Sequence, residues 1–258
     1  MTNTALITGA SGGIGAEMAR YHASKGGDMV LVARKKDRLE ALKSELENHC
    51  GVKAEVVPAD LARADAAKNI FQATREKGLK IDILINNAGF GGHGKFYERD
   101  HAKDQAMMQV NMVSLVNLTH IFLQGMVKRN HGRILHVAST AAFIPGPLQA
   151  VYYATKSFVV SFSQAIAKEL EGTNVSSTVL CPGPVATGFV AAGDLDGVKI
   201  WDKAASPESV AKCGYQAMEK GELVKLNEKK MDFLFNWVAP FLSRKTILKM
   251  SRQAMEKR

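Results

Sequence analysis

Cysteine is scarce in this 258-residue sequence, and long hydrophobic runs are missing from it. The three cysteines, Cys50, Cys181 and Cys213, are widely spaced and form no Cys-x-x-Cys pattern, so neither a disulfide framework nor a zinc site is expected. No stretch of eighteen or more apolar residues is available to cross a bilayer, and a strand predicted from about Thr4 leaves no room for a signal peptide. We therefore expect a cytoplasmic protein.

Histidine clusters and nucleic-acid-binding motifs are also missing. The seven histidines show no metal-ligand spacing, so we predict no metal site; His93 is interpreted as a solvated loop residue and His136 as a satisfied position within a strand. The net charge is +9, but no zinc finger, helix-turn-helix or aromatic platform accompanies it, and we predict no nucleic-acid partner.

Short apolar segments rich in β-branched residues alternate with longer segments of helical periodicity. The predicted strands are Ala5–Thr8, Met29–Ala33, Ala54–Pro58, Ile83–Asn86, Gly132–Ala138, Asn174–Cys181 and Glu222–Leu226. The predicted helices are Ile14–Lys25, Arg38–His49, Ala62–Lys77, Ala102–Arg129, Val151–Glu171 and Pro207–Lys220. This alternation predicts an α/β fold, a single doubly wound Rossmann-type domain over residues 1–226 with a central parallel sheet of about seven strands and helices on both faces.

A glycine-rich segment, Thr8 to Gly15, follows the first predicted strand directly and runs into a helix. In this context glycines let backbone N–H groups approach a pyrophosphate. The spacing Gly9, Gly13, Gly15 differs from the Gly-x-Gly-x-x-Gly form. A plain strand-to-helix turn is the alternative, but its position in the chain favours a dinucleotide site.

The end of the second predicted strand indicates which dinucleotide binds. An acidic residue there would hold the ribose 2′-hydroxyl of NAD(H), whereas an arginine suits the 2′-phosphate of NADP(H). The segment Val30 to Lys36 has no acid, and Arg34 can pair with the phosphate and stack on the adenine, helped by Lys35 and Ser11. Arg34 and Lys35 could instead simply solubilise a loop; we favour the phosphate interpretation and predict NADP(H).

Tyr152 and Lys156 stand four residues apart, so a helix would place both side chains on one face. A phenol titrates near ~10, and an ammonium group close by would lower its pKa and make proton exchange practical at neutral pH. Ser139 lies thirteen residues upstream at the end of an apolar run. We interpret the pair as a general acid/base device, although such pairs also occur on ordinary helix surfaces.

With these motifs in order, the chain resembles the classical short-chain dehydrogenase/reductase family from Thr4 to about Leu226. The Thr-Gly-x-x-x-Gly-x-Gly loop, the Asn-Asn-Ala-Gly motif at residues 86–89 and the Tyr-x-x-x-Lys motif carry the resemblance, together with Asp60–Leu61 and Pro182–Thr187. Asn86 and Asn87 also suit a turn after a strand. The cofactor-binding residues that the resemblance implies are Gly9, Ser11, Gly13, Ile14, Gly15, Arg34, Asp60, Leu61, Asn87, Ala88, Gly89, Tyr152, Lys156, Pro182, Gly183, Val185 and Thr187.

The same resemblance implies a catalytic set of Asn111, Ser139, Tyr152 and Lys156. Ser139 would orient the carbonyl oxygen, Tyr152 would donate the proton, and Lys156 would lower the tyrosine pKa and hold the nicotinamide ribose. Asn111 would keep a water that reloads the proton. Tyr153 is interpreted as pocket wall or core because it has the wrong register to Lys156.

The substrate pocket and the tail are less specific in sequence. Residues 140–150 are mainly apolar, and residues 188–204 have the length of a lid, which predicts an apolar carbonyl or alcohol substrate. Residues 227–258 form a basic amphipathic helical tail that holds eight Lys or Arg against three Asp or Glu. The tail either makes peripheral membrane contact or packs on the body or a partner subunit. The family resemblance implies a homodimer or homotetramer built through the helices 102–129 and 151–171.

The predicted function is an NADP(H)-dependent oxidoreductase that transfers a hydride between nicotinamide and a carbonyl or secondary alcohol. A catalytically silent NADP(H)-binding sensor or scaffold is the alternative, against which the intact catalytic set argues. A nucleotide-sugar epimerase or dehydratase would need a larger C-terminal substrate domain than the 32 residues after Leu226.

Overall fold

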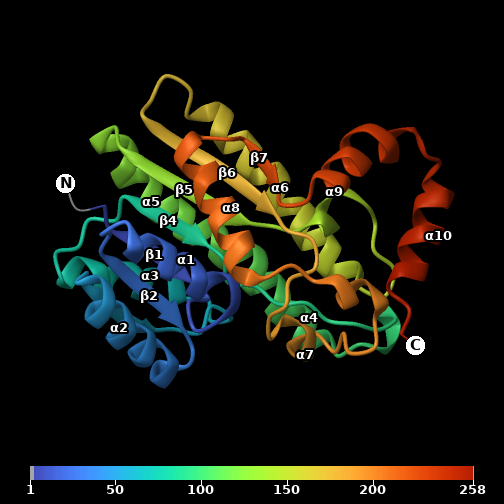
Figure 1. Ribbon diagram of the computed structural model, residues 1–258, viewed down its shortest axis with the longest axis horizontal. Helices are drawn as coiled ribbons and strands as arrows, with labels where there is room; N and C mark the ends of the chain where they lie inside the picture. The colour runs from blue at the N-terminus through green and yellow to red at the C-terminus, as the bar shows by residue number, and fades with distance from the viewer. Residues whose placement is uncertain (1–2, 258) are drawn as a thin grey trace.

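The computed structural model describes residues 3–257, and Met1, Thr2 and Arg258, which the predicted domain and tail include, lie outside the described residues. Within them, seven parallel strands form one sheet in the order β3-β2-β1-β4-β5-β6-β7 (Figure 1). The strands are β1 (Ala5–Thr8), β2 (Met29–Ala33), β3 (Ala54–Pro58), β4 (Ile83–Asn86), β5 (Gly132–Val137), β6 (Val175–Cys181) and β7 (Val224–Leu226). The order reverses between β1 and β4, which is where doubly wound sheets bind their ligands.

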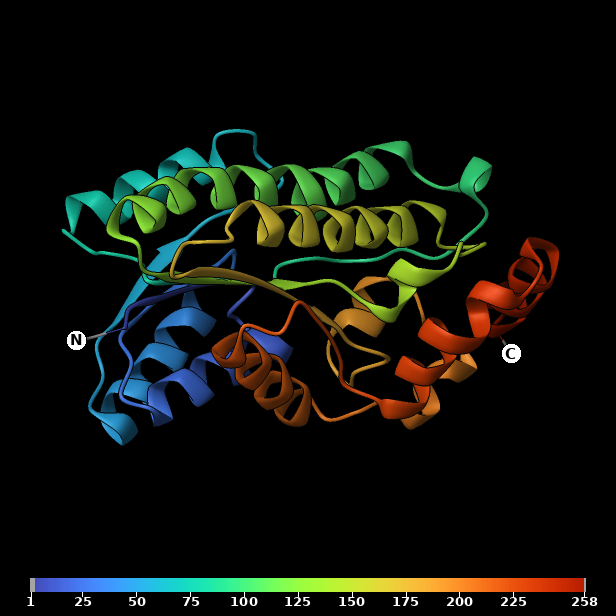
Figure 2. The same cartoon turned by 90° about the horizontal axis from the view of Figure 1, so that it is seen from above.

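Helices cover both faces of the sheet, as predicted (Figure 2). One face carries α1 (Gly13–Ser24), α2 (Lys36–Cys50) and α8 (Pro207–Lys220). The other carries α3 (Ala66–Glu76), α5 (Leu115–Arg129) and α6 (Ala150–Glu169). Shorter helices are α4 (His101–Met108), α7 (Phe189–Ala192), α9 (Lys229–Phe233) and α10 (Arg244–Ala254).

The strands are apolar on both sides because each side packs on helices. In β1, Ala5 and Ile7 enter the core under α1, α2 and α8, while Leu6 enters the core under α3, α5 and α6. Side chains of a strand alternate between faces, so a sheet buried on both sides needs continuous apolar runs. These runs made the first four strands predictable to the residue.

The helix ends differ slightly from the predictions. The predicted helix from Ala62 begins at Ala66, because the Ala62 N–H bonds to Asp60 Oδ1 (3.1 Å) and the chain turns before the helix starts. The last strand begins at Val224 instead of Glu222. Such shifts of a few residues leave the topology unchanged.

The segment His101–Arg129 is one continuous helical stretch, made of α4, a π-helical turn at Gln109–Ser114 and α5. By length and composition it could cross a membrane, with a mean hydropathy of 1.3 in its most apolar window, so the prediction that no segment could do so was wrong. In this fold its apolar residues Leu118, Phe122 and Met126 are buried against the sheet. Buried core helices can have the same length and composition as membrane-spanning helices.

Candidate active site

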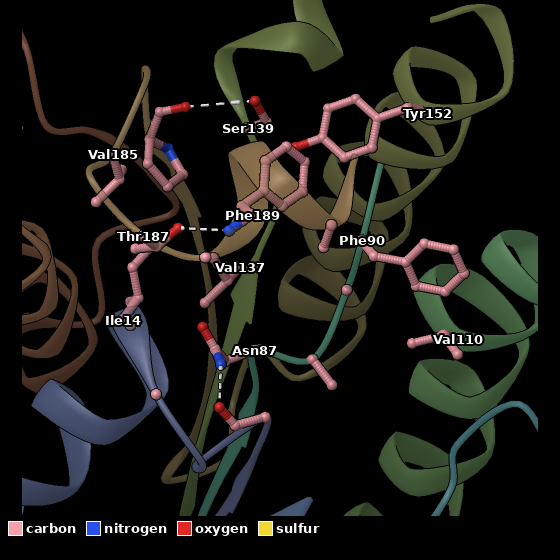
Figure 3. A pocket seen from close by; sticks show the side chains of 18 of the residues that line it. Ile14, Asn87, Phe90, Val110, Val137, Ser139, Tyr152, Val185, Thr187 and Phe189 are labelled. Carbon is pink, nitrogen blue, oxygen red and sulfur yellow. Dashed lines mark hydrogen bonds between the residues drawn. The ribbon is translucent and has the colours of Figure 1, made fainter. Parts of the chain in front are cut away.

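The loops after β1 to β6 enclose a cavity of about 580 Å³ at the carboxyl ends of the strands. All predicted cofactor-binding residues line it except Gly15, and of the predicted catalytic residues Ser139, Tyr152 and Lys156 line it. In Figure 3, Ser139, Tyr152 and Phe189 lie together in one part of the cavity, and Ile14, Asn87 and Thr187 in another. The sequence motifs thus converge on a single site.

The glycine loop is shaped by close approach of neighbouring chain segments. Gly9 and Gly13 have φ values of +69° and +55°, a region that favours glycine. A Cβ at Gly13 would come within 3.0 Å of Thr187 Cγ2. Gly15 lies behind the loop, where a Cβ would be 2.4 Å from Gly9 O, so this glycine lets α1 approach the strand end.

Asn87 joins the glycine loop to the end of β4. Its N–H donates to Thr8 Oγ1 (3.0 Å), and its Nδ2 donates to Thr8 O (2.9 Å). The N–H of Ala88 also donates to Thr8 Oγ1 (3.0 Å). Asn87 is therefore a structural link as well as part of the cavity wall, so the turn-forming and cofactor-lining interpretations of this residue are compatible.

One end of the cavity is basic. Arg34, Lys35 and Arg38 line it and are exposed, and Asp60 and Leu61, which follow the neighbouring strand β3, line it as well. Sequence reasoning missed Arg38, which lies in the first turn of α2 and lines the cavity together with Arg34. Three cations between the end of β2 and the first turn of α2 carry the charge and the donors that a phosphate group needs.

The turn after β6 borders the glycine loop. Pro182, Gly183, Val185 and Thr187 line the cavity, and Thr187 Oγ1 accepts from the N–H of Phe189 (3.2 Å). Thr187 thereby fixes the start of α7, which forms part of the cavity wall. The predicted contact of Thr187 with a cofactor stays a prediction.

Ser139 follows β5, while Tyr152 and Lys156 project from α6. Tyr152 and Lys156 are both buried, and the Lys156 ammonium donates to Val137 O (2.9 Å) and lies 5.8 Å from the Tyr152 ring centre. Lys156 and Tyr152 line the same cavity. The ammonium has three N–H donors, so it can also bind hydroxyl groups of a ligand that reaches Tyr152.

The predicted effect of Lys156 on the tyrosine is wrong in this structure. Burial raises the pKa of Tyr152 above its ordinary value, and a hydrogen bond with Ser139 lowers it only in part. Burial also lowers the pKa of Lys156 to about 8. Sequence spacing shows which groups are near each other but not how strongly each is dehydrated. The buried phenol is protonated at neutral pH, which is the form that a proton donor needs.

Asn111 lies in the π-helical turn and does not line the cavity directly. Its Nδ2 donates to Phe90 O (3.0 Å) and Thr155 Oγ1 (3.1 Å), and its Oδ1 accepts from Phe90 N–H (3.1 Å). The side chain therefore positions the loop after β4 next to α6. Its role in holding a water stays a prediction.

The substrate end of the cavity has walls that the motifs did not reveal. They come from segments far apart in sequence, namely Phe90, Val110, Phe189, Trp201 and Met255. Phe189 packs on Tyr152 with ring centres 5.3 Å apart and on Trp201 at 5.7 Å. The interpretation of Tyr153 as pocket wall is confirmed.

Both singled-out histidines behave differently from the predictions. His93 is half-buried, and its Nε2 is 2.7 Å from the carbonyl oxygen of Met255, so it ties the C-terminal segment to the cavity rim. His136 is buried as expected, but its Nε2 has no hydrogen-bond partner among the described residues. Burial lowers the pKa of His136 to about 3, so its ring is neutral.

The lowered pKa of Lys156 predicts a pH effect on stability. The folded protein holds this proton less tightly than the unfolded chain, so stability rises as pH rises above about 8. Relative to Lys156→Met, the wild type should gain roughly 2 to 3 kcal/mol in free energy of unfolding from about pH 7 to about pH 10. Urea unfolding at both pH values measures this difference. Lys168→Met, an exposed change on the same helix, should follow the wild type; equal trends in all three proteins would contradict the prediction.

A family model described as short chain dehydrogenase matches residues 3–195. The chain belongs to the short-chain dehydrogenase family. It is 35% identical over 193 residues to human 17-beta-hydroxysteroid dehydrogenase type 3, covering 73% of this chain and 61% of that protein.

Two solved structures match nearly the whole length of the chain. One is a structure described under structural and biochemical insights into 7beta-hydroxysteroid dehydrogenase stereoselectivity. It superposes with a TM-score of 0.87 at 25% sequence identity, and the match covers 96% of each chain. A short-chain dehydrogenase from Sphingobium yanoikuyae in complex with NADPH superposes with a TM-score of 0.85 at 30% identity and covers 98% of both. The predicted family and fold are confirmed, and relatives of this chain are oxidoreductases that act on CH–OH groups.

Proposed function

We propose that this short-chain dehydrogenase uses NADP(H) to reduce the carbonyl group of an apolar substrate, or to oxidise the corresponding secondary alcohol. One observation carries the proposal. The Tyr152 and Ser139 hydroxyls and the Lys156 ammonium lie in one cavity whose opposite end is lined by Arg34, Lys35 and Arg38.

The cavity lining fits a dinucleotide with a 2′-phosphate. Glycines at positions 9 and 13 leave backbone space where larger side chains would clash with Asn87 and Thr187. At the basic end, Arg34 can pair with the phosphate through two parallel hydrogen bonds, and Lys35 and Arg38 add charge. A solved relative with NADPH bound supports the choice of NADP(H) over NAD(H).

When bound, NADPH supplies a hydride to the carbonyl carbon. The buried Tyr152 donates its proton to the substrate oxygen, while the Ser139 hydroxyl donates a hydrogen bond to the same oxygen as negative charge builds there. Lys156 donates to the Val137 carbonyl oxygen and can also hold ligand hydroxyl groups there. In the oxidation direction Tyr152 accepts the proton instead.

The proposed substrate is apolar because the groups around Tyr152 are. Phe189 covers the tyrosine ring, Trp201 backs Phe189, and Met255 belongs to the same apolar cluster. Two relatives are named for hydroxysteroids, which are large apolar alcohols. A sugar or a charged acid would leave its polar groups unpaired against this wall.

A screen of substrates tests the proposal. The loss of NADPH absorbance should be measured with apolar ketones, aldehydes and 3-oxoacyl thioesters, with sugars as polar controls and NADH as the alternative cofactor. Faster reaction with apolar ketones and NADPH supports the proposal. Preference for NADH would refute the assignment of Arg34, and preference for sugars would refute the assignment of the pocket.

Met255 should limit the size of the substrate, since its side chain is buried at the cavity wall. Replacing it by alanine should raise kcat/KM for a bulky ketone relative to a small one about tenfold, because three heavy atoms leave the wall. Met250→Ala, on the exposed side of α10, is the control and should change nothing. An unchanged ratio in Met255→Ala would show that the wall lies elsewhere.

We also propose a homodimer or homotetramer formed through α5 and α6. Val127 on α5 and Phe158 on α6 are exposed apolar residues, and Phe158 stacks on Phe162 with ring centres 5.7 Å apart. Sedimentation velocity of the purified chain measures its assembly state.

A cytoplasmic location remains our proposal as well. The free thiols of Cys50, Cys181 and Cys213 suit a reducing compartment.

A further inference from the structure

The C-terminal residues 229–254, here called the arm, project from one end of the body. The arm consists of α9, a π-helical turn at Leu234–Val238, a short 3-10 turn at Ala239–Phe241 and α10. In Figures 1 and 2 it stands apart from the sheet and its covering helices, and its chain then returns toward α7. Most of its residues are exposed.

The first half of the arm has two apolar faces, and only one of them packs. Phe235 is buried and stacks on Phe143 with ring centres 5.3 Å apart, and Ala239 is buried beside it. On the other face, Phe233, Trp237 and Phe241 expose 62%, 69% and 83% of their surface. Single exposed aromatic residues are common, but three within nine consecutive residues, here called the patch, indicate an interaction surface.

The patch is flanked by positive charge. The arm contains six Lys or Arg and one Asp. Among the described residues, the ion pairs of this region use Arg252 with Glu256 and Lys257 with Asp194. The remaining cations are exposed and form no salt bridge within that part of the chain: Lys229, Lys230, Arg244, Lys245 and Lys249.

We propose that the arm docks on an anionic lipid surface. Tryptophan and phenylalanine enter the headgroup region of a bilayer, and each nearby Lys or Arg adds attraction to anionic headgroups. A second copy of this chain fits the patch less well, since a symmetric contact would bring two arms of net charge +5 together. Charge and aromatic content together favour lipid.

The arm also connects the docking face to the active site. Directly after α10, Met255 forms part of the cavity wall, its carbonyl oxygen is bound by His93 (2.7 Å), and Lys257 pairs with Asp194 of the lid segment (2.9 Å). Docking would hold the cavity rim beside the bilayer. If the proposed apolar substrate is right, such a substrate could pass from lipid to the pocket with little exposure to water.

Vesicle co-sedimentation of the full-length protein tests the proposal independently of activity. Deleting the arm is unsuitable because it would remove Met255 from the pocket, so point variants are needed. The test variant is Phe233→Ser, Trp237→Ser, Phe241→Ser, and the control is Leu223→Ser, which removes an exposed apolar side chain at the amino end of β7, outside the arm. Vesicles are phosphatidylcholine alone or mixed with phosphatidylglycerol.

We expect the wild type and the control to bind the anionic vesicles and the test variant to lose at least about tenfold in partitioning. In a Trp201→Phe background, the emission of Trp237 should shift to the blue on anionic vesicles, which tests the unaltered patch directly. No binding by the wild type, equal binding by the test variant, or no shift of Trp237 would each overturn the proposal. Self-association lost in the test variant, without vesicle binding, would assign the patch to a second copy instead.

Discussion

Replacing Tyr152 by phenylalanine should lower kcat about a thousandfold, with NADPH affinity nearly unchanged. The phenol is the buried proton donor beside Ser139, whereas the ring, which packs on Phe189, is retained in the variant. The cavity wall formed by the Tyr152 and Phe189 rings therefore stays intact in the variant, and only the phenolic proton donor is lost. Steady-state turnover and fluorescence titration with NADPH measure the two effects separately.

Tyr153 provides the matched control. It is buried, it lines the same cavity, and burial raises its pKa in the same direction. Tyr153→Phe should therefore keep turnover within a few-fold of the wild type. A cofactor-binding sensor without turnover would lose nothing in either variant, so undiminished function of Tyr152→Phe would favour that alternative and contradict the catalytic assignment.

Arg34→Ala should reduce the preference for NADPH over NADH by about ten- to a hundredfold, measured as the ratio of kcat/KM values. Losing a charge-assisted hydrogen bond to a phosphate costs about 1.5 to 3 kcal/mol, and NADH has no 2′-phosphate to lose. The change should appear in KM for NADPH, with kcat retained, because Arg34 lines the cavity end remote from Tyr152.

Arg63→Ala is the control for this second prediction, because Arg63 is exposed and does not line the cavity. Adding Arg38→Ala to Arg34→Ala should lower the ratio further, since both cations line the same end. If the ratio of kcat/KM for NADPH to that for NADH is unchanged in the double variant, the basic end does not bind a phosphate, and other residues determine the choice of cofactor.

The sheet and the cofactor loop could be predicted from sequence because local rules determine them. Strands buried on both faces give continuous apolar runs. The positive φ angles at positions 9 and 13 favour glycine, and these glycines can be recognised in the sequence. The resemblance to the short-chain dehydrogenase family, and not a local rule, implied that Ser139, Tyr152 and Lys156 act together. The strands and the glycine loop depend on residues close together in sequence.

Features that depend on distant segments could not be predicted. Met255 enters the pocket wall because the C-terminal chain returns to His93, and no local pattern encodes that contact. The pKa of Tyr152 was predicted in the wrong direction because its dehydration arises from the assembled pocket. The helical spacing in the arm was visible in sequence, but its division into a packed face at Phe235 and a bare face at Trp237 required the structure.

Isotope transfer tests the central claim most directly. NADPH with deuterium at both C4 positions is incubated with the enzyme and the best apolar ketone of the screen, and the product is analysed by mass spectrometry. We expect an alcohol with one deuterium on its carbinol carbon, and a much slower appearance of this product with Tyr152→Phe. An alcohol without deuterium, or equal labelling rates in both proteins, would contradict hydride transfer assisted by Tyr152.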